Sequence, residues 1–272
     1  MDSVLKQRII TAFVLIAAVF ASVLLLPNIW FAVVALLVFV SISGWEWSRL
    51  VSLEGFHRGL YVAWLLLVAY FAYRWNDFRL IVMVLGLFWW AFVLVLLAIY
   101  EQGTTLYKEN KWLLRASAFF VLVPAWVGLI TLHQLHPSLV IYLIALVAMA
   151  DTGAYFTGKA FGKNKLAPEL SPGKTREGML GGLLGATTLS IFGAWYFALP
   201  VHDWVYFIFL SMVVAIMSVA GDLFESLMKR EVGLKDSGNI LPGHGGILDR
   251  VDGILAALPI FTMGVLWGAI QV

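Results

Sequence analysis

Nine long apolar segments constrain the fold of this chain more than any other feature of its sequence. A helix that crosses the roughly 30 Å hydrocarbon core of a membrane needs about 17–25 residues. Hydrophobic residues make up 62% of the chain and charged residues 12%, against about 45–50% and about 25% in soluble domains. We therefore predict an all-α, polytopic integral membrane protein with about nine transmembrane helices, at residues 9–26, 29–47, 59–73, 79–99, 112–132, 138–158, 178–199, 204–222 and 251–270.

Lysine and arginine are distributed unequally between the two ends of these segments. If the N-terminus is cytoplasmic, sixteen of the 18 basic residues lie on the cytoplasmic side, and only Arg74 and Arg79 lie outside. Basic residues concentrate in the cytoplasmic loops of membrane proteins. This bias predicts a cytoplasmic N-terminus and location in the cytoplasmic (inner) membrane. No basic run indicates a nucleic-acid partner, and the absence of cysteine excludes thiol chemistry.

The polar residues with chemical potential gather in the second half of the chain. Residues 1–135 have short loops and few polar groups inside their apolar segments, whereas residues 136–272 contain three polar clusters on the predicted cytoplasmic side. We expect one continuous membrane domain, with N-terminal transmembrane helices at 1–135 and a catalytic C-terminal part at 136–272.

The first cluster is DTGAYFTGKAFG, residues 151–162. Asp151 follows about 12 apolar residues, which is about 18 Å of helix from the outer face. A charge at the bilayer centre costs at least about 2.5–3.5 kcal/mol, so a water-filled cavity should reach this carboxylate. The alternative is an aspartate that bonds to a neighbouring helix.

The second cluster is SPGKTREG, residues 171–178. Its Gly-Lys-Thr is not a P-loop, because that motif needs glycine where the chain has Pro168. Lys174 and Arg176 lie on a predicted Gly/Pro loop at the start of the next helix, where exposed amides and the helix dipole favour phosphate. The alternative is a basic loop that only orients the helix in the membrane.

The third cluster lies around Ser226–Asp252, SLMKREVGLKDSGNILPGHGGILDRVD. Helical spacing predicts one polar stripe near the inner membrane edge and a pair of carboxylates at the start of the last span. The stripe consists of Asp222, Glu225, Ser226 and Lys229, and the pair of Asp249 and Asp252.

Three of these carboxylates predict a metal site. Asp222, Asp249 and Asp252 should reach similar depth on the same side of the membrane. Hard oxygen ligands without cysteine suit Mg²⁺, which also takes water and substrate phosphate. The alternative for each is an ion pair with a basic residue of a neighbouring helix. A metal beside basic residues at the membrane edge predicts phosphoryl or nucleotidyl transfer.

The clusters also resemble a known signature. The strings S-P-x-K-T-x-E-G, S-x-x-K-R, K-D and H-G-G-x-x-D-R-x-D occur in the order found in the phosphatidate cytidylyltransferase (CDP-diacylglycerol synthase) family, and the resemblance covers residues 151–252. It implies that CTP and phosphatidic acid react to give CDP-diacylglycerol and pyrophosphate in phospholipid biosynthesis. It also implies Mg²⁺ on Asp222, Asp249 and Asp252, with a second cation left open.

The resemblance further implies roles for individual residues. Those implied in catalysis are Lys229, Arg230, Lys235, Asp236, His244 and Asp249. Those implied in substrate binding are Asp151, Ser171, Lys174, Thr175, Arg176, Glu177, Glu225, Ser226 and Arg250. The expected partners are the two substrates and membrane lipid, and a homodimer is left open.

Two other functions remain open on the residues alone. A CTP-dependent lipid kinase would use the same metal and basic loops but would transfer the γ-phosphate. An ion-coupled transporter would use Asp151 and Asp222 as ion sites, and transporters often contain repeated halves. The chain shows no repeat, and its charges gather on one side, which favours an enzyme.

Overall fold

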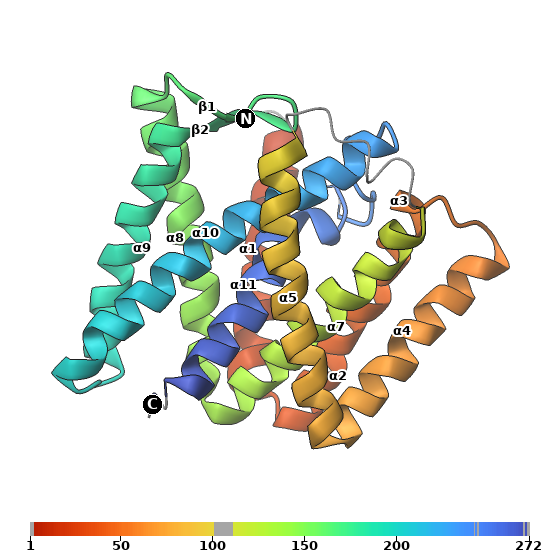
Figure 1. Ribbon diagram of the computed structural model, residues 1–272, viewed down its shortest axis with the longest axis horizontal. Coiled ribbons are helices and arrows are strands. Elements are labelled where there is room, and N and C mark those ends of the chain that lie inside the picture. Colours follow the sequence, from red (N-terminus) through yellow and green to blue (C-terminus); the bar gives the residue numbers. More distant parts are fainter. Residues whose placement is uncertain (1–2, 101–110, 242, 244, 269, 271–272) are drawn as a thin grey trace.

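The protein is a bundle of helices that run between two ends of the molecule, with one short hairpin at one end (Figure 1). The computed structural model describes residues 3–100, 111–241, 243, 245–268 and 270. In chain order the elements are α1 (Ser3–Leu25), α2 (Asn28–Leu36), the π-helix η1 (Leu37–Ile42), α3 (Ser43–Leu50), α4 (Phe56–Arg74), α5 (Asn76–Tyr100), α7 (Lys111–Leu135), α8 (Pro137–Phe161), β1 (Lys165–Ala167), β2 (Ser171–Thr175), α9 (Arg176–Tyr196), α10 (Val201–Glu231) and α11 (Leu248–Trp267).

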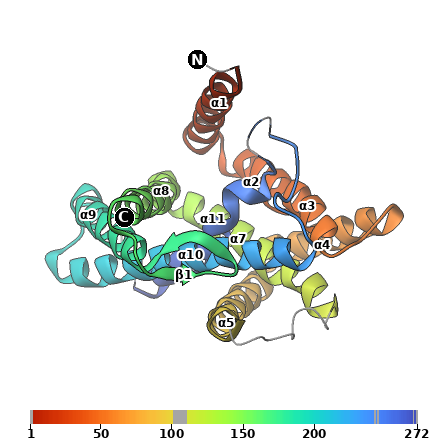
Figure 2. The ribbon, with the colours of Figure 1, turned by 90° about the horizontal axis from the view of Figure 1, so that it is seen from above.

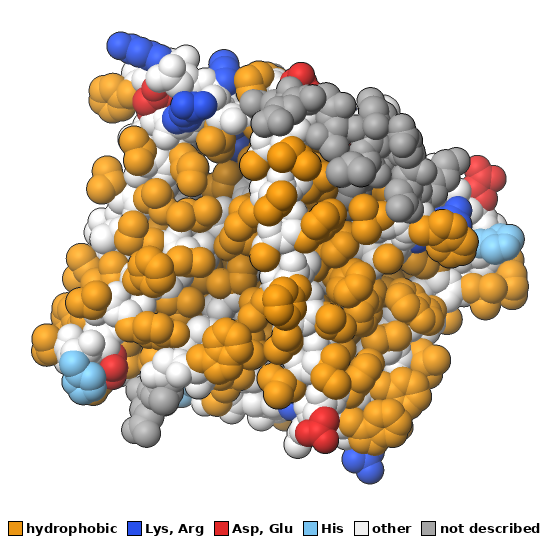
Figure 3. Space-filling view, in the orientation of Figure 1, with side chains coloured by type: hydrophobic (Ala, Val, Ile, Leu, Met, Phe, Trp, Pro, Cys, Tyr) orange, Lys and Arg blue, Asp and Glu red, His pale blue; other side chains and the backbone are white. Residues whose placement is uncertain are grey.

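The membrane-spanning helices confirm the predicted fold class. Among the described residues, eight helices are long and apolar enough to cross a membrane, with α2, η1 and α3 forming one continuous span. The first predicted segment lies in α1, whose apolar part Ile10–Leu25 is shorter than the other eight. On the face shown in Figure 3, hydrophobic side chains cover the middle, and charged side chains gather at the two ends. The chain is therefore an all-α, polytopic integral membrane protein.

One apolar core joins the two halves of the chain. Phe224 of α10 is fully buried, and its ring centroid lies 5.9 Å from that of Trp90 in α5 and 6.2 Å from that of Trp47 in α3. Figure 2 shows α10 crossing the centre of the molecule and α1 at its edge. The helix that carries the predicted polar stripe is therefore anchored by residues from the N-terminal half.

Small residues bring α8 and α9 into close contact. A Cβ added to Gly153 would lie 2.6 Å from the carbonyl oxygen of Gly181, and one added to Gly181 would collide with the Thr157 side chain. The helices approach this closely only because both residues are glycine. Close packing of helices through small residues is common in membranes. This contact fixes the part of α8 that contains Asp151 beside α9.

A hairpin replaces the predicted loop between these two helices. Strands β1 and β2 are antiparallel, with Lys165 opposite Thr175 and Ala167 opposite Ser171. The expectation of an irregular Gly/Pro loop at 171–175 was therefore wrong, although β2 does lead directly into α9. The hairpin lies at the same end of the bundle as the C-terminus of α10 and the N-terminus of α11 (Figure 1).

Candidate active site

A group of carboxylates surrounds Lys174 at this end of the bundle. The Lys174 ammonium lies 2.6 Å from the Asp222 carboxylate and joins β2 to α10. Asp151 of α8 and Asp252 of α11 both interact electrostatically with Lys174 and with Asp222. We call these four residues the Lys174 cluster. It combines three carboxyl groups with one ammonium group.

A second, more deeply buried group surrounds Lys229. Its ammonium lies 2.8 Å from Asp249 and 3.1 Å from Glu225, which is 3% exposed. Burying a charge costs several kcal/mol unless a partner with good geometry offsets it, and here one lysine serves two carboxylates. Lys229, Glu225 and Asp249 form the Lys229 cluster, which joins α10 to the start of α11.

Asp249 also fixes the loop between α10 and α11, residues 232–247. Its Oδ2 accepts hydrogen bonds from the amide N–H of Ser237 at 2.9 Å, the Ser237 hydroxyl at 2.9 Å and the amide N–H of Gly246 at 2.8 Å. Its Oδ1 accepts the bond from Lys229 at 2.8 Å. Both oxygens are therefore bonded within the chain, and Asp249 links Ser237 and Gly246 of the loop to Lys229.

Glu46 is a site residue that the sequence interpretation missed. Glu46 is 1% exposed, and its carboxylate accepts hydrogen bonds from the amide N–H of Leu248 at 2.7 Å and that of Ile247 at 3.1 Å. The Ser237 hydroxyl lies 3.3 Å away and shares its one hydrogen between Glu46 and Asp249. A negative charge at a helix N-terminus is stabilised by the helix dipole, so Glu46 of α3 caps α11 from another helix. A carboxylate inside the predicted 29–47 span was the available signal, because charges in such segments are generally functional.

Two glycines of the loop are required by this contact. A Cβ on Gly238 would collide with the Glu46 carboxylate, and one on Gly246 would collide with both Glu46 and the Ser237 hydroxyl. Glycine at these positions therefore follows from the close approach of the loop to α3.

Other predicted residues stabilise the start of α9. The Thr175 side chain caps the helix by accepting a 3.1 Å hydrogen bond from the Gly178 amide. Glu177 accepts hydrogen bonds from the Asn164 side-chain amide at 2.6 Å and from the Lys163 backbone amide at 3.1 Å. Thr175 and Glu177 therefore stabilise the conformation of the connection between α8 and α9.

The remaining predicted residues lie around the two clusters. The Ser226 hydroxyl donates to Asp222 at 3.4 Å, and Arg230 donates to the Leu234 carbonyl at 3.4 Å. Ser171 begins β2. The exposed residues at this end include Arg176, Arg230, Lys235, Asp236 and Arg250. His244 lies outside the described residues.

The carboxylates fit a magnesium ion only in part. No three His, Cys, Asp or Glu side chains among the described residues are arranged to hold a metal ion. Asp249 is engaged by Lys229 and the loop. Asp222 is paired with Lys174 and interacts with Asp252, which has no ion pair with a described lysine or arginine. Mg²⁺ often takes only one or two carboxylates and completes its shell with water and phosphate. Asp222 and Asp252 fit that pattern, and the metal site remains a prediction.

Comparisons with known proteins extend over almost the whole chain. The model of a family described as the cytidylyltransferase family matches residues 6–267. The phosphatidate cytidylyltransferase of Pseudomonas aeruginosa is 40% identical over 268 residues, which are 97% of this chain and 98% of that protein. The proteins of the same name from Haemophilus influenzae and Bacillus subtilis are 38% and 34% identical, over 95% and 94% of this chain and 97% and 95% of their own lengths.

Proposed function

Because the chain belongs to the cytidylyltransferase family, we propose that it transfers the cytidylyl group of CTP to phosphatidic acid and releases CDP-diacylglycerol and pyrophosphate. The main observation behind this proposal is that the three polar clusters of the sequence lie together at one end of a membrane bundle. Lys174 and Lys229 there are held by carboxylates of α10 and α11, in a chain similar to phosphatidate cytidylyltransferases over its length.

The position of the site suits one lipid substrate and one soluble substrate. The Lys174 and Lys229 clusters lie where α10 and α11 reach the polar end of the bundle (Figure 1). Phosphatidic acid can stay in the bilayer with its phosphate at this level, while CTP arrives from the water. We place this end on the cytoplasmic side of the inner membrane, because sixteen of the 18 basic residues then face the cytoplasm.

The reaction is a substitution at the α-phosphorus of CTP. An oxygen of the lipid phosphate forms a bond to that phosphorus, the bond from the phosphorus to the oxygen that bridges to the β-phosphate breaks, and pyrophosphate leaves with the electron pair. Such transfers depend on positioning and on neutralising the charge of the phosphates. Lys174 and the exposed Arg176 at the start of α9 supply positive charge and helix N–H groups for this purpose.

The carboxylates hold other groups of the site in position and take no covalent part in the reaction. Glu225 and Asp249 hold the Lys229 ammonium at a fixed point between α10 and α11, and Asp249 orders the loop that carries Lys235 and Asp236. Asp222 and Asp252 would hold Mg²⁺, which when bound neutralises triphosphate charge as a Lewis acid. We expect the basic residues Lys174, Arg176, Lys229, Arg230, Lys235 and Arg250, together with His244, to contact the phosphates of the two substrates.

Product analysis with purified protein tests this proposal. In detergent micelles that contain phosphatidic acid, adding CTP and Mg²⁺ should release pyrophosphate and form a lipid whose mass equals CDP-diacylglycerol. Omitting either substrate should abolish both signals. The proposal is wrong if neither product forms and the same preparation, reconstituted in vesicles, instead carries an ion flux.

A further inference from the structure

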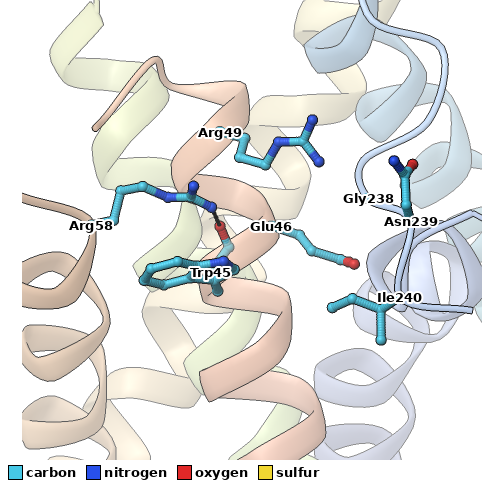
Figure 4. Close-up of a pocket in the computed structure, with 7 residues that line it drawn as sticks. All are labelled: Trp45, Glu46, Arg49, Arg58, Gly238, Asn239 and Ile240. Carbon is cyan, nitrogen blue, oxygen red and sulfur yellow. Dashed lines mark hydrogen bonds between the residues drawn. The ribbon is translucent and has the colours of Figure 1, made fainter. Parts of the chain in front are cut away.

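A cavity with a mainly apolar surface and two arginines in its wall lies next to the loop between α10 and α11, outside both clusters. It has a volume of about 240 Å³ and lies between α3, the start of α4 and the loop before α11 (Figure 4). At about 30 Å³ of liquid volume per water, that space exceeds what a few waters need. Its lining residues are Trp45, Glu46, Arg49, Arg58, Gly238, Asn239 and Ile240.

The cavity contains two arginines without an acidic partner. The Arg49 and Arg58 guanidinium groups are close enough to repel each other, and neither forms an ion pair with a described carboxylate. The Glu46 carboxylate in the same wall is occupied by hydrogen bonds from the loop, toward which it points in Figure 4. The cavity therefore has an excess of positive charge that an anion would offset.

Internal contacts hold both guanidinium groups in place. Arg58 donates to the Ser48 hydroxyl at 2.8 Å and to the Trp45 carbonyl at 3.0 Å, and its Cζ lies 4.0 Å from the centre of the Trp45 ring. Arg49 donates from Nη1 to the Ser237 carbonyl at 3.3 Å. A guanidinium has five N–H donors, so each arginine keeps donors for a ligand, and arginine is well suited to phosphate.

The rim of the cavity is apolar, which indicates a lipid rather than a free anion. Trp45 is 44% exposed and Ile240 is 49% exposed, both on the cavity wall. A phospholipid presents a phosphate to the arginines and acyl chains to such a rim. Hydrogen bonds join the cavity wall to the active site, because Ser237 accepts from Arg49 through its carbonyl and donates to Asp249 through its hydroxyl.

We propose that this cavity binds the phosphate of phosphatidic acid and delivers the lipid to the site beside Asp249. The inference rests on the proposed function for the identity of the lipid, and on Arg49, Arg58 and the apolar rim for the binding itself. Free CTP, which has no acyl chains, is expected to bind elsewhere, near Lys174.

Substrate kinetics in mixed micelles test the proposal. Replacing Arg58 by glutamine should raise the KM for phosphatidic acid by at least about tenfold, since losing a charged hydrogen-bond donor costs about 1.4 kcal/mol or more. The KM for CTP should stay within about twofold of the wild-type value. Arg58→Lys, which keeps the charge, should restore part of the loss. Arg74→Gln, at the other end of α4, is the matched control and should change neither KM.

A second variant avoids any effect on folding. Ile240 is half-exposed, so Ile240→Asp should insert normally and place a negative charge at the rim. It should raise the KM for phosphatidic acid, whereas the neutral Ile240→Asn should have a smaller effect. An unchanged KM for phosphatidic acid in both Arg58→Gln and Ile240→Asp overturns the proposal, and so does a raised KM for CTP alone.

A binding measurement separates this proposal from the proposed reaction. Short-chain phosphatidic acid should raise the melting temperature of the wild-type protein more than phosphatidylcholine of equal chain length, and Arg49→Gln should lose that difference. If the loss occurs but no CDP-diacylglycerol forms, the cavity is a lipid site and the proposed function fails. If product forms while phosphatidic acid stabilises wild type and variant equally, the proposed cavity is wrong and the function stands.

Discussion

Replacing Glu46 by glutamine should loosen the loop that precedes α11. One oxygen of Glu46 accepts the Ile247 amide, and the other accepts the Leu248 amide and the Ser237 hydroxyl. Glutamine keeps one acceptor oxygen and puts an NH₂ group in place of the other, so at least one buried N–H loses its acceptor. An unsatisfied buried donor costs about 1–3 kcal/mol, which is a factor of about 5–150 in the opening equilibrium of the loop.

Hydrogen–deuterium exchange measures this change directly. Peptides that cover residues 236–252 should exchange about 5–150-fold faster in Glu46→Gln than in the wild type, and turnover should fall because this loop carries Lys235 and Asp236. Glu54→Gln is the matched control, because Glu54 is exposed in the connection between α3 and α4. Unchanged exchange at Ile247 and Leu248 in a variant that has lost activity would refute the positioning role of Glu46.

Two further predictions concern topology and metal binding. The chain has no cysteine, so single cysteines can report on which side of the membrane a residue lies. A cysteine at Asn76 should react with an impermeant thiol reagent in intact cells, and a cysteine at Asn239 should react only after permeabilisation. The reverse pattern would contradict the cytoplasmic N-terminus. Asp222→Asn and Asp252→Asn should each reduce Mg²⁺-dependent turnover by more than the about 10–100-fold that loss of an outer-shell partner costs. Near-normal activity of both variants across a Mg²⁺ titration would exclude these two residues as metal ligands.

The parts of the fold that depend on local pattern could be predicted from the sequence. Hydropathy located the spanning helices because each helix must be apolar over the thickness of the membrane. Helical spacing also grouped Asp222, Glu225, Ser226 and Lys229 correctly, since α10 continues unbroken to Glu231. The pair Asp249 and Asp252 does begin the last helix.

The parts that depend on distant contacts could not be predicted in this way. Glu46 bonds to residues about two hundred positions later in the chain, and no periodic pattern encodes that pairing. The hairpin of β1 and β2 has strands of only three and five residues, which are too short for an alternating pattern to be recognised. Spacing also could not reveal that the Asp249 oxygens bond to Lys229, Ser237 and Gly246, and its role as a metal ligand stays a prediction.

The transfer of label from CTP tests the proposed reaction most directly. Cytidylyl transfer leaves the α-phosphate on the lipid, whereas a lipid kinase would leave the γ-phosphate there. With purified protein, phosphatidic acid and Mg²⁺, we predict that label from α-³²P CTP enters the lipid phase and that label from γ-³²P CTP leaves as pyrophosphate. Lipid labelled only from the γ-position would contradict the account and identify the protein as a CTP-dependent lipid kinase.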